Sequence, residues 1–305
     1  MTAQHQVKGL FFVITSGFFF GVACVISKIL LNGGSTPLLL ILSRNLFGAF
    51  CLGLFMFFYR RTLFRIDKTD VKTFILCGIV MFIYSAAYFF CLYYIDLSIA
   101  VMLLYLYPSM VAAASVFLYK EKLTFKLVSV LILTLLGLAL TLNLFSTGFD
   151  KISLPGLILG LAAAVGAAGY CIYVKKLSGK YHAFTINFYG LICTVIGYTA
   201  MIPFSSLEPL SHGQLCAALA AAFPYISGFL FYSAGVKYLK PSFAAIFGNS
   251  EVVFDILLAF LILGEIFSFS QGIGMLLIIG AIVLLELPLK NSKIQHCKCG
   301  HHPTS

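Results

Sequence analysis

Apolar runs of about twenty residues, separated by short polar breaks, follow one another along almost the whole chain. A helix that rises 1.5 Å per residue needs about 20 residues to cross roughly 30 Å of hydrocarbon. Ten runs reach that length, and we expect each to be a membrane-spanning helix. The expected spans are 9–31, 36–58, 71–95, 97–118, 125–145, 154–175, 182–203, 213–236, 241–263 and 269–289.

The composition agrees with this pattern and excludes a soluble domain. Hydrophobic residues make up 61% of the chain and charged residues only 10%, with a mean hydropathy of +1.04. Soluble domains carry about 25% charged residues. The net charge of +10 does not indicate a nucleic-acid partner, because the basic residues gather at the ends of the spans. The expected surroundings of the chain are a lipid bilayer.

The placement of the basic residues predicts the orientation of the chain. If the N-terminus is cytoplasmic, 17 of the 20 Lys and Arg residues fall on the cytoplasmic side. The exceptions are Lys28, Arg44 and Lys151. This asymmetry follows the positive-inside rule, so we expect a multi-pass protein of the plasma membrane with both termini in the cytoplasm.

The two halves of the chain share a faint repeat. Ser98, Ala100 and Glu121 recur 144 positions later as Ser242, Ala244 and Glu265. Each half holds five spans, an odd number, so the second half must insert upside down relative to the first. The sequence therefore predicts an all-α membrane protein of ten transmembrane helices in two inverted repeats. The expected segments are a first repeat at 1–145, a linker at 146–153, a second repeat at 154–289 and a cytoplasmic tail at 290–305.

Charged residues inside these apolar runs are the first candidates for a functional site. The ninth run carries Asn249, Glu251 and Asp255 near its middle. A charge at that depth costs about 2.5–3.5 kcal/mol on insertion scales, so it usually faces a protein interior or a watery cavity. Glu251 and Asp255 are four residues apart and share a helix face. Such a carboxylate pair is suited to proton coupling.

Arg44 lies roughly 12 Å below the outer end of the second span, close to the midplane. It either faces inward and meets an anionic partner or reaches the outer headgroups, and we favour the first arrangement. Glu251 is the expected partner. The two residues then either form part of a binding site or make a structural ion pair that joins the halves.

Tyrosines and a proline extend the candidate site. Tyr84 and Tyr88 share one face of the third span, where their hydroxyls either line a polar cavity or bond to a neighbouring helix. Pro108 interrupts the fourth span beside Tyr105, and broken helices at membrane depth usually line a cavity. The predicted substrate-binding residues are Arg44, Tyr84, Tyr88, Tyr105, Asn187, Tyr232, Asn249 and Glu251.

Other kinds of site find less support in the sequence. All six histidines lie at or beyond the ends of the spans, so no zinc-protease motif or buried histidine base exists in the membrane and we expect no enzyme. The tail concentrates His296, Cys297, Cys299, His301 and His302, but their spacing matches no structural zinc pattern. We therefore expect no required metal and no cofactor.

The paired segments LYLYPSMVAAASVFLYKEKLT and FGNSEVVFDILLAFLILGEIFSFSQGIGMLLIIGAIVLL resemble the EamA-like, ten-helix members of the drug/metabolite transporter superfamily. Gly21 and Arg44 also fit that family. Val252 departs from it, because the second half often has proline after the glutamate, and the chain has no tryptophan. The resemblance implies a cavity lined by spans one to four and six to nine, braced by spans five and ten.

The resemblance and the buried charges together predict a secondary transporter. The expected mechanism is alternating access around Arg44, the tyrosines and Glu251. The expected substrate is a small organic metabolite, such as an amino acid, moved outward by a monomer or homodimer. A channel and a non-transporting membrane scaffold are the alternatives, although no glycine-rich filter loop is present and the cytoplasmic loops are short.

The predicted orientation can be tested by cysteine labelling. Cysteines placed at Glu208 and Asp150 should react with an impermeant reagent added outside the cell, because both positions lie in loops expected to face outward. A cysteine at Lys68 should react only after permeabilisation. The reverse pattern would contradict the orientation.

Overall fold

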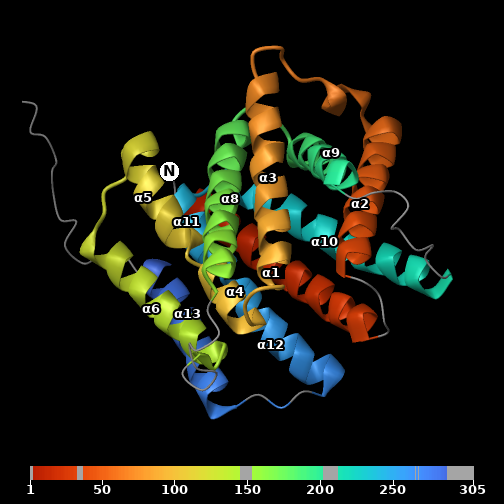
Figure 1. Cartoon of the computed structure of the whole chain (residues 1–305). Helices are drawn as coiled ribbons and strands as arrows, with labels where there is room; N and C mark the ends of the chain where they lie inside the picture. Colours follow the sequence, from red (N-terminus) through yellow and green to blue (C-terminus); the bar gives the residue numbers. More distant parts are fainter. Residues whose placement is uncertain are drawn as a thin grey trace, which may run out of the picture.

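The computed structural model describes residues 3–32, 37–144, 153–201, 212–264, 266 and 268–286, and every regular element in these ranges is a helix. The elements are α1 (Ala3–Asn32), α2 (Pro37–Tyr59), the short 3₁₀ helix η1 (Arg61–Phe64), α3 (Val71–Cys91), α4 (Leu97–Leu104), α5 (Tyr107–Tyr119), α6 (Phe125–Thr141), α8 (Leu154–Ser178), α9 (Ala183–Met201), α10 (His212–Val236), α11 (Pro241–Gly248), α12 (Ser250–Leu263) and α13 (Phe269–Glu286). Figure 1 shows them as one bundle.

Eight helical stretches in the described ranges are long and apolar enough to cross a membrane, by length and composition. Two further apolar helices, Phe125–Thr141 and Phe269–Leu285, are shorter. These two correspond to the fifth and tenth expected spans. The multi-pass helical fold is confirmed, while the full count of ten spans stays a prediction.

The expected fourth span is broken into α4 and α5, as Pro108 predicted. Pro108 lies in the first turn of α5, where its missing N–H costs no intrahelical hydrogen bond. The expected ninth span is also broken, into α11 and α12, even though Val252 and not a proline follows Glu251. The second break therefore has a different cause from the first.

A hydrogen bond from the first broken helix stabilises the break in the second. The backbone N–H of Asn249 donates to the carbonyl of Ile246, at 3.1 Å, instead of to Ala245 four residues back. The freed Ala245 carbonyl accepts from the Tyr107 hydroxyl at 3.0 Å. Gly248 leaves room for this contact, since a methyl group there would lie 2.7 Å from the Tyr107 oxygen. The two breaks thus pack directly against each other.

Helices from the two halves pair across the bundle. The main contacts join α1 to α10, α3 to α8 and α6 to α13, and Figure 1 shows the last two pairs side by side. The first two contacts are counterparts with the halves exchanged, because α1 and α3 stand in the first half as α8 and α10 stand in the second. Likewise, α1 packs on α11 and α12, while α8 packs on α4 and α5.

Glycines allow the closest of these contacts. A methyl group at Gly17 would lie 2.5 Å from the Ser250 hydroxyl and 2.9 Å from the Glu251 backbone nitrogen. One at Gly21 would lie 3.0 Å from the Phe254 side chain. The GxxxG spacing of α1 therefore holds the first turn of α12, which carries Glu251, against α1.

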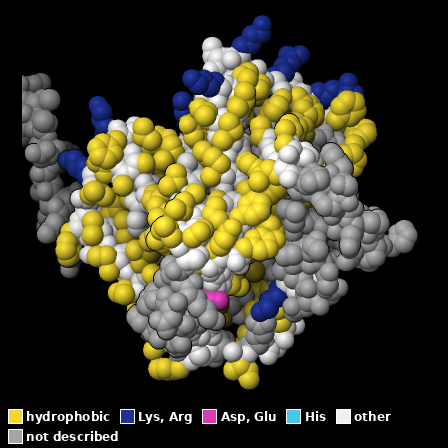
Figure 2. Space-filling view, viewed as in Figure 1, with side chains coloured by type: hydrophobic (Ala, Val, Ile, Leu, Met, Phe, Trp, Pro, Cys, Tyr) yellow, Lys and Arg dark blue, Asp and Glu magenta, His cyan; other side chains and the backbone are white. Residues whose placement is uncertain are grey.

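One end of the bundle carries most of the basic side chains, and we call it the basic end. Figure 2 shows dark blue Lys and Arg side chains gathered there, above a face covered by hydrophobic side chains. Its described members are Lys8, Arg60, Arg61, Arg65, Lys68, Lys72, Lys120, Lys122, Lys126, Lys175, Lys176, Lys180, Lys237 and Lys240.

Lysines at the basic end also cap the C-termini of helices. Lys175 Nζ donates to the carbonyls of Val236, Lys237 and Leu239, at 2.9, 3.1 and 2.6 Å, where α10 ends. Lys126 Nζ donates to the Leu285 carbonyl near the end of α13, at 2.7 Å. A cation is favourable at a helix C-terminus, where carbonyls lack intrahelical partners.

Gly274 and Gly280 offer a matched test of the contact between α6 and α13. A methyl group at Gly274 would lie 2.5 Å from the Gly137 carbonyl oxygen, whereas one at Gly280 would meet nothing within 4 Å. Gly274→Ala should lower the stability of the protein in detergent by about 1–3 kcal/mol, as overpacking does. Gly280→Ala should leave it unchanged or raise it by up to about 1 kcal/mol through helix propensity. Thermal unfolding would check both, and equal destabilisation would contradict the contact.

Candidate functional site

A cluster of polar side chains lies inside the bundle around the first turn of α12. We call it the Glu251 cluster. Its members come from α1, α2, α3, α10, α12 and the first helix break: Cys24, Arg44, Tyr84, Tyr88, Tyr105, Tyr107, Tyr225, Glu251 and Asp255. Six of these nine residues belong to the predicted site.

Glu251 is the residue with which the other members of the cluster interact. Its carboxyl group interacts with Asp255 on the same helix face, with Arg44 from α2 and with the hydroxyl of Tyr105 at the first helix break. The hydroxyls of Tyr84, Tyr88, Tyr107 and Tyr225 are also within electrostatic range of Glu251. Side chains far apart in the sequence therefore converge on one carboxyl group.

Arg44 faces the bundle rather than the headgroups. Its guanidinium carbon lies 3.6 Å from the centroid of the Tyr225 ring, in a cation–π contact. Its Nε is buried and has no hydrogen-bond partner. Arg44 and Glu251, both described residues, interact electrostatically without forming a direct ion pair. Arg44 thus keeps a hydrogen-bond donor for another partner.

Other buried polar atoms in or beside the cluster also lack a hydrogen-bond partner. They are Oδ1 of Asp255 in α12, and Oδ1 of Asn249 and Oγ of Ser250 where α11 ends and α12 begins. A buried polar group without a hydrogen bond costs about 1–3 kcal/mol, so such atoms seldom gather without a functional reason. Together with Arg44 Nε, these atoms leave donors and acceptors available to a polar ligand inside the bundle.

Asn187 and Tyr232 lie in a second polar group, between α8, α9 and α10. The Asn187 amide donates to Ser233 Oγ at 2.9 Å and to the Phe229 carbonyl at 3.2 Å, and its oxygen accepts from the Tyr170 hydroxyl at 2.9 Å. The Tyr232 ring stacks on Tyr170, with the ring centroids 6.2 Å apart. The hydrogen-bonding groups of Asn187 are therefore already used to join three helices, and its role in binding stays a prediction.

Tyr225, Tyr107 and Cys24 belong to the cluster but were not among the predicted site residues. Tyr225 follows Pro224 and lies seven residues before Tyr232, two turns along the same helix face. Cys24 lies three residues after Gly21 on α1 and interacts with both Glu251 and Asp255. The spacing of Tyr225 from Tyr232 and of Cys24 from Gly21 could have indicated that these residues face the site. Only the packed bundle, however, shows which helix faces meet.

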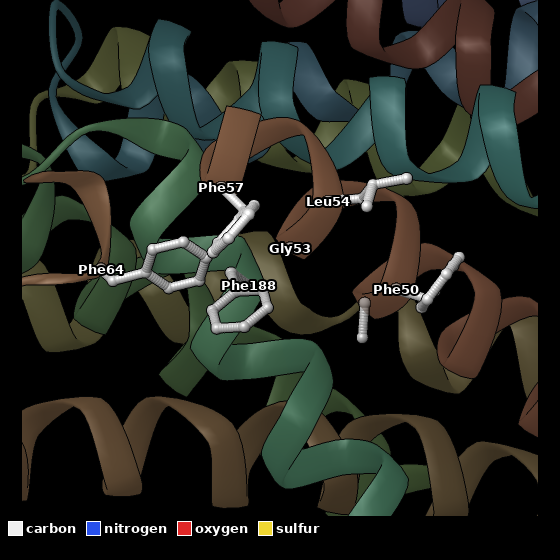
Figure 3. A pocket seen from close by; sticks show the side chains of 7 residues that line it. Phe50, Gly53, Leu54, Phe57, Phe64 and Phe188 are labelled. Atoms are coloured by element: carbon white, nitrogen blue, oxygen red, sulfur yellow. The ribbon is translucent and has the colours of Figure 1, made fainter. Parts of the chain in front are cut away.

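Two cavities lie away from the Glu251 cluster. One, of about 340 Å³, is lined by apolar side chains of α2, η1 and α9, and Figure 3 shows it from close by. The other, of about 500 Å³, lies at the basic end among η1, the turn between α8 and α9, and Lys237.

In the described part of the chain, no group of three or more His, Cys, Asp and Glu residues is placed to hold a metal. The His- and Cys-rich tail lies outside the described residues.

The sequence pattern of the EamA-like transporter family matches residues 7–143 and, a second time, residues 154–287. Curated relatives include an uncharacterized transporter of Archaeoglobus fulgidus, 26% identical over 213 residues, 70% of this chain and 76% of the relative. Another is the pseudopaline exporter CntI of Pseudomonas aeruginosa (strain UCBPP-PA14), 22% identical over 221 residues, 72% of this chain and 77% of the relative.

An uncharacterized transporter of Synechocystis sp. is 25% identical over 214 residues, which are 69% of this chain and 65% of that protein. The match therefore spans less than two thirds of this relative's length. A solved crystal structure matches with a TM-score of 0.78 and 19% identity, over 93% of this chain and 97% of the other. The solved structure supports the fold alone.

The contact between Arg44 and Tyr225 can be tested by two substitutions at one position. Tyr225→Leu removes the ring under the guanidinium and should destabilise the protein by about 2 kcal/mol or more, the scale of a desolvated cation–π contact. Tyr225→Phe keeps the ring and should cost clearly less. Thermal unfolding in detergent would compare the two. Equal losses would contradict a role for the ring face.

Proposed function

The chain belongs to the EamA-like transporter family, and from this premise we propose that it is a secondary transporter that moves small organic metabolites by alternating access. Relatives that are named as transporters support the general role. The observation that carries the mechanism is the Glu251 cluster, a set of partly unpaired polar groups beside two broken helices in an apolar bundle. Secondary transporters bind substrate near the bilayer midplane, often at discontinuous helices.

We infer that ten spans form two inverted repeats, with a first repeat at 1–145, a linker at 146–153 and a second repeat at 154–289. Two observations support this arrangement. The family pattern matches once in each half, and the main packing contacts, such as α1 with α10 and α8 with α3, recur with the halves exchanged. In such an arrangement the substrate site lies between the halves, and their rocking exposes it to each side in turn.

The proposed substrate carries both an ammonium and a carboxylate group, as amino acids do. Arg44 has a donor without a partner and suits a carboxylate, while Glu251 suits an ammonium group. The rings of Tyr84, Tyr88 and Tyr105 would surround the apolar part of the substrate. Asn249 has an unpaired oxygen nearby, and Asn187 and Tyr232 are proposed to join the site from the adjoining polar group. Glu251 and Asp255 are the groups proposed to couple transport to protons.

We propose that the protein exports its substrate across the plasma membrane, with both termini in the cytoplasm, as a monomer or homodimer. The charge asymmetry of the basic end supports the orientation. The outward direction is supported by the relative named as a pseudopaline exporter, at 22% identity.

Flux in proteoliposomes tests this function. Glu251→Gln keeps the size of the side chain but cannot carry a negative charge, so we expect at least about tenfold slower substrate flux and a loss of its pH dependence. Amino acids, amines and related metabolites form the substrate panel. Asp96→Asn, which neutralises an exposed carboxylate before α4, is the matched control and should transport at the parental rate. A folded Glu251→Gln protein with parental flux and pH dependence would refute the proposal.

A further inference from the structure

An apolar groove runs along the membrane-facing side of α2, and we call it the aromatic groove. Its lining residues are Ala49, Phe50, Gly53, Leu54, Phe57, Phe64 and Phe188. The side chains of Phe50, Leu54 and Phe57 are 64%, 46% and 46% exposed. Figure 3 shows the rings of Phe57, Phe64 and Phe188 together on one side and Phe50 on the other. The groove is therefore open to the surroundings of the bundle.

The second cavity, which we call the basic cavity, lies at the basic end. Its lining residues are Arg60, Thr62, Leu63, Arg65, Asp67, Ser178, Gly179, Lys180, Tyr181, His182, Thr185 and Lys237. They come from the segment after α2, from the turn between α8 and α9, and from the end of α10. Both halves of the chain thus contribute to its walls.

The aromatic groove and the basic cavity adjoin on three elements. Phe57 of the groove and Arg60 of the cavity are three residues apart at the end of α2. Phe64 and Arg65 are neighbours at η1, and Phe188 and Thr185 are one turn apart on α9. The guanidinium of Arg61 lies 4.1 Å from the centroid of the Phe57 ring, at this junction. One continuous surface therefore changes from apolar to basic within a single helical turn.

The walls of this surface are held in place by hydrogen bonds across the two halves. The Tyr189 hydroxyl donates to the Phe64 carbonyl at 2.7 Å, and Thr185 Oγ1 donates to the Leu63 carbonyl at 2.7 Å. The Asp67 backbone N–H donates to the Tyr181 hydroxyl at 3.0 Å. These bonds fix η1 against α9, so the site is formed before a ligand arrives.

The basic cavity keeps an excess of positive charge. Lys180 pairs with Asp67 at 2.5 Å and with Asp70 at 2.6 Å. Lys180 thus pairs with both acidic side chains at the cavity, and the bonds from Lys180 and Tyr181 lower the pKa of Asp70. With Lys180, Arg60, Arg65 and Lys237 the lining carries more cations than carboxylates. In the described part of the chain, Arg60, Arg65 and Lys237 have no acidic partner. Burial, together with the nearby charges of Lys237 and Arg60, lowers the pKa of His182. This convergence of cations favours an anion.

The length of the aromatic groove fits one leaflet of a membrane. From Phe50 to Phe57, α2 rises about 10 Å at 1.5 Å per residue. Half of the hydrocarbon core is about 15 Å thick. The groove therefore begins at the basic end and extends into the hydrocarbon of the leaflet on that side. An apolar groove of this length offers nothing to a small inorganic anion, but it suits an acyl chain.

We propose that the aromatic groove and the basic cavity together bind an anionic phospholipid, with its phosphate in the basic cavity and one acyl chain along the aromatic groove. The bound lipid contacts α2 and η1 from the first half and α9 and Lys237 from the second. It is thus placed to hold these segments together. The inference does not depend on the substrate or the direction of transport.

The charged part of the site is tested by removing two cations. The purified protein is mixed with equal amounts of phosphatidylglycerol and phosphatidylcholine, and bound lipid is measured by native mass spectrometry. We expect the parent to retain phosphatidylglycerol in preference. Arg60→Gln with Arg65→Gln should weaken this retention by about tenfold or more, because each cation at a membrane surface attracts anionic lipid.

Lys120→Gln with Lys122→Gln is the matched control, since it removes the same charge from the same end away from the cavity. This control should retain phosphatidylglycerol like the parent. An equal loss in both double variants would mean unspecific attraction and would overturn the proposal. Thermal unfolding checks that each variant is folded. If the arginine pair fails to fold, Lys237→Gln tests the same cavity with the same expected direction.

The apolar part is tested by filling the groove. Leu54→Trp places a larger side chain in the groove and should lower phosphatidylglycerol retention several-fold. Leu46→Trp is the control on the same helix, because Leu46 is similarly exposed, at 50%, but lies outside the groove. Inorganic phosphate is added as a competitor in a separate arm. If phosphate displaces the lipid at millimolar concentration and Leu54→Trp has no effect, the cavity binds free anions and the phospholipid proposal is wrong.

Discussion

The cost of placing Glu251 and Asp255 in an apolar helix is the constraint on which the rest of the bundle depends. A charge in hydrocarbon must be enclosed by protein or neutralised. The bundle meets this requirement with Arg44, a set of tyrosine hydroxyls and the close packing of α1 against the first turn of α12 at Gly17. Because the enclosing side chains come from α1, α2, α3 and α10, the same requirement brings distant parts of the chain together. The enclosure is incomplete, since Arg44 Nε and Asp255 Oδ1 keep no hydrogen-bond partner. Unpaired groups at the centre of a stable bundle are the features that a polar substrate can use.

The two helix breaks stand beside this cluster and stabilise each other. Backbone groups inside a membrane must find partners within the protein, so a broken helix persists only where a neighbour supplies them. Here the Tyr107 hydroxyl satisfies the Ala245 carbonyl that the break at Asn249 leaves free. The first break has a covalent cause, Pro108, whereas the second arises from packing against the first. A change of contact between the halves would therefore alter the second break directly.

Charge is divided between the centre and one end of the molecule. At the centre, few charges lie in apolar surroundings and each has several neighbours. At the basic end, lysines donate hydrogen bonds to the C-terminal carbonyls of helices. Other cations there give an excess of positive charge around a cavity next to an apolar groove. The first arrangement suits a polar ligand inside the protein, and the second suits an amphiphile at its surface. The separation follows from solvent, since exposed cations remain hydrated at the basic end whereas buried ones need protein partners.

The sequence by itself determined the class of structure and its chemistry. Apolar runs of membrane length, the asymmetry of Lys and Arg, Pro108 and the charges at positions 44, 251 and 255 are local or compositional features, and each predicts its consequence without knowledge of neighbours. Helix boundaries agreed within a few residues in most cases, because the change from apolar to polar residues marks them. Tertiary structure decided the contacts. Arg44 lies on Tyr225 rather than in a direct ion pair with Glu251, Asn187 is engaged by Tyr170 and Ser233, and α11 ends without a proline. Each of these depends on which helix faces meet, and in a chain that is apolar on almost every face the hydrophobic pattern cannot specify that pairing.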